Sequence, residues 1–182
     1  MPGGYVFLDI EDLVRSALNK KYGTEQWILG SVDNSIYLDH EVLAKKNVEL
    51  ATACRTAVDA ILAVPQGHAA RVLTREELGH GVSGDFVTNA LRNGFFPARS
   101  GDIIVVFEPY YMPPQKDPTR TTHFTPYNYD THVPVLFLGA GIKPGRYSGN
   151  ISVNDIAPTL ATMLDVELPS GASGRVLTEM LR

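Results

Sequence analysis

Two dense apolar runs constrain the fold of this 182-residue sequence most strongly: "IIVVF" at 103–107 and "VPVLFL" at 133–138. Neither run alternates with polar residues, which is the pattern of strands covered on both faces of a sheet. About two dozen residues separate the runs, and a connection of that length is too long for a hairpin. The sequence therefore predicts that 103–107 and 135–138 are neighbouring or nearby buried strands of a mostly parallel sheet flanked by helices.

The connection between the two runs is a candidate functional loop. It is rich in proline and has no hydrophobic periodicity, and its four tyrosines and one phenylalanine argue against disorder. The loop ends at His132, directly before the second run. An imidazole at the edge of a buried strand can serve in catalysis or bind a metal, or it can simply be held by structural hydrogen bonds, and the residues alone leave these alternatives open. Asp130 and Thr131 stand beside His132 and could fix its tautomer by hydrogen bonding.

The first half of the chain predicts a small α+β region over residues 1–98, followed by an α/β part over 99–182. Apolar spacing, capping residues and turn signals give the expected elements. In chain order they are a helix beginning after Asp9, a hairpin over 26–39, a helix over 41–63, a strand over 69–74, a helix within 83–94, the two strands named above, and a helix over 154–164 packed on one face of the sheet.

Several residues that can carry chemistry have a simpler structural interpretation. Asp39 precedes a helix and is expected to cap it. The single cysteine, Cys54, is expected to be a small core residue, and His68 and His80 are expected on the surface. The "GAGIKPG" run at 139–145 predicts a turn, because a dinucleotide-binding loop must open a helix.

Composition describes an ordinary globular chain. Hydrophobic residues make up 44%, and the formal net charge is -4. This mild acidity gives no reason to expect nucleic-acid binding, whose proteins carry basic surfaces. The sequence has no long apolar span and no basic segment followed by an apolar one at its start, so neither a membrane span nor a signal peptide is expected.

Three blocks of the sequence carry a resemblance to a known family. They are "RSGDIIVVFEPYY" (99–111), "TTHFTPYNYDTHVPVLFLGAGIKPGRY" (121–147) and "VNDIAPTLATMLDVELPSGASGRVLTEML" (153–181). In this order they resemble the C-terminal part of zinc-dependent alkaline phosphatases, a group related to type I phosphodiesterases and nucleotide pyrophosphatases. The resemblance implies an alkaline phosphatase-like α/β core in which residues 1–98 form an inserted α+β region.

The resemblance also implies a chemistry. Members of this group hold two zinc ions and hydrolyse phosphate esters through a threonine or serine nucleophile. Their last metal ligand in chain order is a histidine directly before an apolar strand, which is His132 here. His123 is then expected to lie near the site without binding the metal.

The family's nucleophile and its other metal-binding motifs have no counterpart in this sequence, so no catalytic residue is assigned. The expected function is that of a C-terminal segment of a zinc-dependent phosphomonoesterase or phosphodiesterase. Such a segment is expected to be inactive alone, to bind zinc weakly at most, and to meet substrate only together with an N-terminal half. A non-catalytic binding module, or one chain of a split enzyme, is the alternative. The resemblance implies a periplasmic or secreted parent, as in many relatives.

The same reasoning predicts self-association. Strands meant to pair with a missing half leave unpaired backbone groups along a sheet edge, and apolar faces meant for a core stay exposed. We therefore expect the chain to associate with copies of itself.

Overall fold

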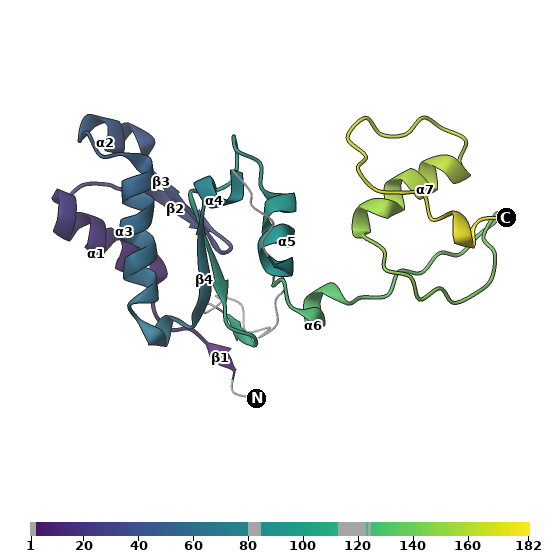
Figure 1. The fold of residues 1–182 in the computed structure, drawn as a ribbon, viewed down its shortest axis with the longest axis horizontal. Helices are drawn as coiled ribbons and strands as arrows, with labels where there is room; N and C mark the ends of the chain where they lie inside the picture. Colours follow the sequence, from purple (N-terminus) through teal and green to yellow (C-terminus); the bar gives the residue numbers. More distant parts are fainter. Residues whose placement is uncertain (1–2, 80–84, 113–122, 124) are drawn as a thin grey trace. The chain divides into compact units, whose positions relative to one another are not determined.

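The computed structural model describes residues 3–79, 85–112, 123 and 125–182 (Figure 1). The chain divides into two compact units, Met1–Val133 (unit 1) and Pro134–Arg182 (unit 2). Each unit is described by itself. No helix within the described ranges has the length and apolar character needed to cross a bilayer.

A four-stranded antiparallel sheet forms the centre of unit 1. Its strands lie in the order β2-β3-β5-β4, with bounds β2 Ile28–Val32, β3 Ser35–Leu38, β5 Ile103–Phe107 and β4 Ala69–Thr74. The predicted hairpin and the predicted strands at 69–74 and 103–107 are confirmed. Asp33, with φ 53°, supplies the left-handed residue that lets β2 turn directly into β3.

Parallel pairing occurs in a second, smaller sheet. There β1 (Gly4–Tyr5) lies parallel to β6 (Tyr111–Met112). The predicted α/β class is confirmed, with parallel pairing limited to this pair among the described residues. The boundary between the two units lies at Val133 and Pro134, whereas the sequence interpretation placed a boundary at 98 and 99. The strand β5, which lies after residue 99, pairs with both β3 and β4 of the first half of the chain. The expected division into 1–98 and 99–182 stays a prediction.

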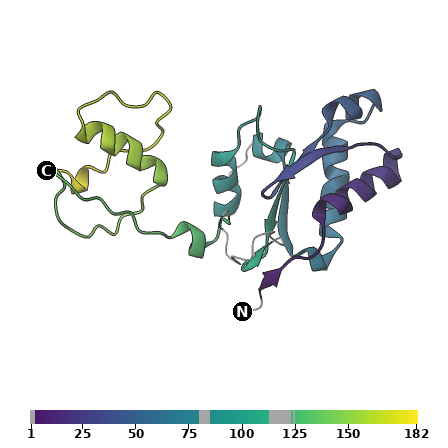
Figure 2. The ribbon, with the colours of Figure 1, turned by 180° about the vertical axis from the view of Figure 1, so that it is seen from behind.

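Helices cover both sides of the four-stranded sheet (Figures 1 and 2). One side carries α1 (Ile10–Tyr22) and α3 (Leu50–Leu62), and the other carries α5 (Phe86–Gly94). The remaining helical segments of unit 1 are α2 His40–Lys45, η1 Pro65–Gly67, α4 Arg75–Gly79 and α6 Asn128–Thr131. The core of unit 1 includes the fully buried side chains of Val14, Leu18, Trp27, Ile61 and Ile103.

Two sequence predictions for the helices have different outcomes. The single helix expected over 41–63 is wrong, because Asn47 takes a left-handed conformation (φ 54°) between α2 and α3, and a helix cannot continue through it. The cap expected at Asp39 is confirmed. Its Oδ1 accepts hydrogen bonds from the backbone N–H groups of Glu41 and Val42, both at 3.0 Å.

Unit 2 is built around one short helix, α7 (Ile156–Met163), which confirms most of the helix expected over 154–164. The 3-10 segments η2 (Val153–Asp155) and η3 (Thr178–Met180) accompany it. Asp155 ties the unit together, because its carboxylate accepts from the N–H groups of Ser152 (2.9 Å) and Arg175 (2.8 Å). These two bonds lower the pKa of Asp155.

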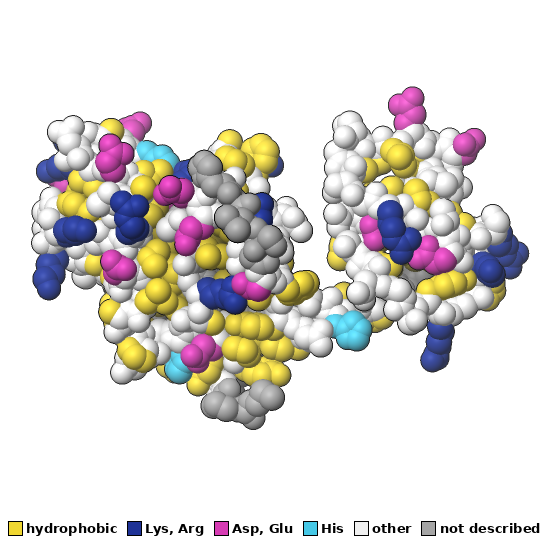
Figure 3. All heavy atoms as spheres, in the orientation of Figure 1, with side chains coloured by type: hydrophobic (Ala, Val, Ile, Leu, Met, Phe, Trp, Pro, Cys, Tyr) yellow, Lys and Arg dark blue, Asp and Glu magenta, His cyan; other side chains and the backbone are white. Residues whose placement is uncertain are grey.

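The buried strand predicted over 135–138 is wrong. These residues belong to no strand, and the side chains of Leu136 and Leu138 are 90% and 103% exposed. A strand forms only beside a pairing neighbour, and none of the described residues of unit 2 gives this run one. For the same reason α7 packs on no sheet face in unit 2. Figure 3 shows hydrophobic side chains among the surface atoms of both units.

Candidate functional site

His132 lies at the C-terminal end of α6, at the end of unit 1. Its backbone N–H donates to the carbonyl oxygen of Asn128 at 2.9 Å, which closes the single turn of the helix. The residue is exposed, and no hydrogen bond joins its ring to any described residue. The imidazole is therefore available to a ligand.

The residues expected beside His132 have other partners. The carboxylate of Asp130 accepts from the backbone N–H (3.0 Å) and the hydroxyl (2.6 Å) of Thr125. The hydroxyl of Thr131 donates to the carbonyl oxygen of Tyr127 at 3.2 Å. His123 is exposed and lies between residues 122 and 124, which are outside the described residues. The expectation that these three residues act near the site stays a prediction.

The described residues do not form a complete metal site by themselves. No group of three or more His, Cys, Asp or Glu side chains that could hold a metal occurs in the part of the chain that the structure describes. A zinc site in a protein takes three or four such ligands. His132 can supply one of them, and the others have to come from elsewhere.

Tyrosine side chains connect α6 to the sheet, a feature that the sequence interpretation missed. The hydroxyl of Tyr127 donates to the carbonyl oxygen of Phe107, the last residue of β5, at 2.6 Å. The rings of Tyr110 and Tyr129 stack with centroids 4.7 Å apart, and the Tyr129 hydroxyl accepts from the N–H of Tyr110 at 3.0 Å. The only signal in the sequence was the unusual number of tyrosines in the loop.

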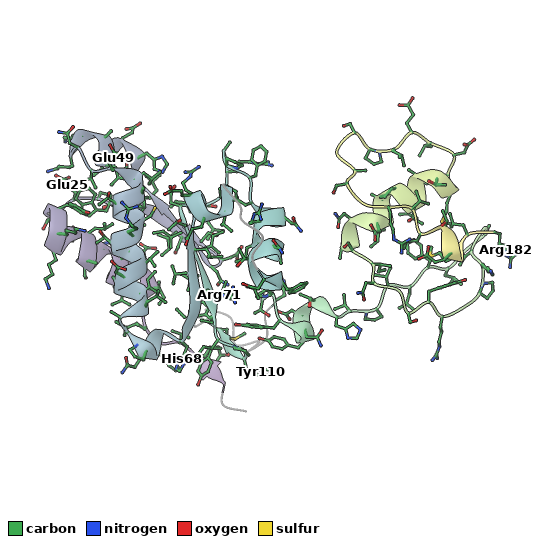
Figure 4. All side chains as sticks on the ribbon, in the orientation of Figure 1. Glu25, Glu49, His68, Arg71, Tyr110 and Arg182 are labelled. Carbon is green, nitrogen blue, oxygen red and sulfur yellow. The ribbon has the colours of Figure 1, made fainter. Side chains whose placement is uncertain are left out.

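A second histidine of unit 1 has partners that the sequence did not indicate. The ring of His68 stacks on Tyr111 with centroids 3.7 Å apart, and its Nδ1 lies 2.9 Å from a carboxylate oxygen of Glu108. His68 and Tyr110 lie at the same end of unit 1 (Figure 4). His68 was expected only as a surface residue, and with a side chain 31% exposed it helps to hold the start of the loop.

A buried acid, Asp102, lies directly before β5, at the end of this strand opposite Phe107. Its carboxylate accepts from the N–H of Leu38 (2.8 Å), from Nε2 of His40 (2.9 Å) and from Arg75 (2.6 Å). Only 3% of the Asp102 side chain is exposed. These contacts join β3, α2 and α4 to the start of β5, which indicates a structural role. The sequence placed Asp102 directly before a buried strand without showing these partners.

Cys54 is a core residue, as predicted. It is 2% exposed, and its thiol contacts the carbonyl oxygen of Asp102. Burial, followed by the nearby charge of Asp102, raises the pKa of the thiol to about 12. A thiol with such a pKa stays protonated near neutral pH and is a poor nucleophile.

Comparisons with known proteins identify the family. No family model matches the sequence. Alkaline phosphatase PafA of Elizabethkingia meningoseptica is 30% identical over 181 residues, a match that covers 100% of this chain and 33% of PafA. The crystal structure of PafA superposes on the whole chain with a TM-score of 0.88 and covers 34% of the PafA chain. The chain belongs to the alkaline phosphatase superfamily.

The chain represents the C-terminal part of this superfamily, and other relatives match most or all of its length. Alkaline phosphatase PhoV of Synechococcus elongatus is 26% identical over 182 residues, and a protein named calcium-transporting ATPase from Myroides odoratus is 30% identical over 172 residues. A crystal structure of a PafA mutant superposes with a TM-score of 0.86. The chain spans about a third of the length of these relatives.

Proposed function

We propose that this chain is the C-terminal third of a phosphate-ester hydrolase and that His132 is one of the ligands of its metal centre. The observation that carries the proposal is the similarity to PafA along the whole chain, in sequence and in structure. The free imidazole of His132 supports it, because a metal ligand must offer an unpaired ring nitrogen. Zinc is the metal we propose, since imidazole is among its usual ligands.

A bound zinc centre would supply the chemistry of phosphate-ester hydrolysis, because zinc activates a nucleophile and stabilises the leaving oxygen of the ester. The contribution of this chain is to present a neutral imidazole at a fixed position, because a protonated ring cannot bind the metal. The nucleophile and the other ligands lie in the part of the relatives that this chain does not cover. Because relatives are named alkaline phosphatases, we propose phosphate monoesters as the substrates. Diesters and nucleotide pyrophosphates are the alternatives that the resemblance leaves open.

The test compares this chain alone with a PafA chimaera, in which the chain replaces the matching third of PafA. Both are assayed with p-nitrophenyl phosphate and with bis(p-nitrophenyl) phosphate in added zinc. We expect negligible turnover by the chain alone, because one imidazole leaves a metal mostly hydrated and no activated hydroxyl is present. We expect the chimaera to hydrolyse the monoester. Robust turnover by the chain alone, or a folded chimaera without activity, contradicts the proposal.

We also propose that the chain self-associates when nothing covers the apolar run at 133–138. Exposed apolar side chains of this kind are unusual on a monomer, and Leu136 and Leu138 offer the strongest exposure. We expect oligomers at micromolar concentration in sedimentation velocity. Changing both leucines to lysine should shift the chain towards monomer.

The matched control for this change is Leu62→Lys, on a leucine that is 51% exposed at the end of α3 in unit 1. This change replaces an exposed leucine outside the run with a charged residue, so the oligomers should persist. A monomeric parent chain that binds no hydrophobic dye contradicts the self-association proposal.

A further inference from the structure

His132 directly follows α6, a helix that is too short to be stable by itself. α6 has only four residues, and none of them is buried. Isolated helices of one turn are unstable in water, because the cost of forming the first turn is not recovered. Contacts outside α6 must therefore fix it, and whatever fixes α6 also fixes the backbone of His132.

Tyr127 links α6 to β5, a central strand of the sheet. Its hydroxyl bonds to the carbonyl oxygen of Phe107 at 2.6 Å, and β5 is paired on both sides. Its own carbonyl oxygen accepts from the N–H groups of Asp130 (2.9 Å) and Thr131 (3.0 Å), inside the turn of α6. Burial, and then the neighbouring Tyr129, raise the pKa of the Tyr127 hydroxyl, so that it stays a donor. Tyr127 thus joins the end of β5 to the single turn of α6.

Tyr129 and Tyr110 hold the other side of the same turn. Their rings stack at 4.7 Å, the Tyr129 hydroxyl accepts from the N–H of Tyr110, and the rings of Tyr127 and Tyr129 lie 5.8 Å apart. Tyr110 adopts a left-handed backbone conformation, with φ 68°. A residue other than glycine keeps this conformation only where its surroundings impose it. We call Tyr110, Tyr127 and Tyr129 the tyrosine clamp.

We propose that the tyrosine clamp positions His132 for metal binding and that Tyr127 is its main positioning residue, an inference that rests on the proposed function. Ligands of a metal must be held close to their productive geometry, and the groups that hold them affect affinity almost as strongly as the ligands do. The clamp does this through the backbone. It fixes α6 on the end of β5, and the ring of His132 stays free for the metal.

The first test measures amide hydrogen exchange in the full chain carrying Tyr127→Phe. This change removes the hydroxyl bond and keeps the ring. We expect the amide of His132 to exchange about fivefold faster, which corresponds to the net contribution of one hydrogen bond. The amides of β5 should be unchanged, since local opening does not require global unfolding.

Tyr147→Phe is the matched control for this test. The Tyr147 hydroxyl also donates to a backbone carbonyl oxygen, that of Lys143 at 3.2 Å, but it lies in unit 2. It should leave the exchange of His132 unchanged. Unchanged exchange at His132 in Tyr127→Phe overturns the proposal, and so does an equal acceleration throughout β5, which identifies Tyr127 as a general stability residue.

The second test uses the PafA chimaera and measures the zinc that stays bound after dialysis, together with the free zinc needed for half-maximal activity. We expect Tyr127→Phe to raise the zinc requirement roughly tenfold, and excess zinc to restore the rate. Because zinc binding can also offset a folding defect, the urea midpoint of the zinc-free chimaera is measured as well and should be unchanged in Tyr127→Phe. If His132→Ala leaves the zinc requirement unchanged, the proposed function fails. If His132→Ala raises it and Tyr127→Phe does not, only the clamp proposal fails.

Discussion

Replacing His132 by alanine in the PafA chimaera is expected to lower kcat/KM by at least about 100-fold. Loss of a group that merely supports a metal ligand costs 10–100-fold in affinity or activity, and loss of the ligand itself should cost no less. The zinc bound per molecule should fall as well, because the remaining ligands hold the ion less well. The measurement is steady-state hydrolysis of p-nitrophenyl phosphate, with the metal content of the same samples.

His123→Ala is the matched control, since both residues are exposed histidines of the same loop. It should leave rate and zinc content close to those of the parent chimaera. An equal loss in the two variants would contradict the assignment of His132 as the ligand and of His123 as a neighbour. A His132→Ala chimaera with full activity and full zinc content would remove His132 from the site.

Local features of the fold could be predicted from the sequence. The helix after Asp9, the hairpin at β2 and β3, and the strand β5 follow from periodicity, capping and turn residues, which act over a few positions. The Asp39 cap is of the same kind. These predictions succeeded because the interactions that determine them lie within the same short stretch of chain.

Non-local features could not be predicted in this way. The run at 135–138 has the composition of a strand buried on both faces, but a strand also needs neighbours, and composition does not say whether they are present. The interruption between α2 and α3 depends on one left-handed residue, Asn47, within an otherwise helical pattern. Each of these outcomes is decided by conformations or partners that leave no periodic signal.

The candidate site could also be predicted only in part from the sequence. His132 could be singled out because it lies directly before an apolar run in a loop that resembles a known family. The contacts that hold it could not, because the Tyr127–Phe107 bond joins residues 20 positions apart through a hydroxyl and a carbonyl group. Every residue other than proline offers such a carbonyl together with an N–H, and proline offers the carbonyl alone, so no sequence pattern marks the partner.

Replacing Asp102 by alanine is expected to destabilise unit 1 by about 3–5 kcal/mol, the usual cost of removing one partner of a buried ion pair. The change leaves the guanidinium of Arg75 without its carboxylate, at a site where the Arg75 side chain is 25% exposed. It also leaves the N–H of Leu38 without its acceptor within the sheet. Because small domains are stable by only about 5–15 kcal/mol, much of unit 1 should unfold under mild denaturant.

Urea unfolding followed by the fluorescence of Trp27 measures this effect, since Trp27 is the single tryptophan of the chain and is fully buried in unit 1. The matched control is Asp12→Ala, which breaks an ion pair with Arg15 on the surface, where the Asp12 side chain is 65% exposed. Exposed pairs contribute about 0–1 kcal/mol, so the control should barely move the unfolding midpoint. Equal shifts in the two variants would mean that Asp102 stabilises the sheet no more than a surface charge does. Its contacts with Leu38, His40 and Arg75 would then contribute little to the free energy of unfolding.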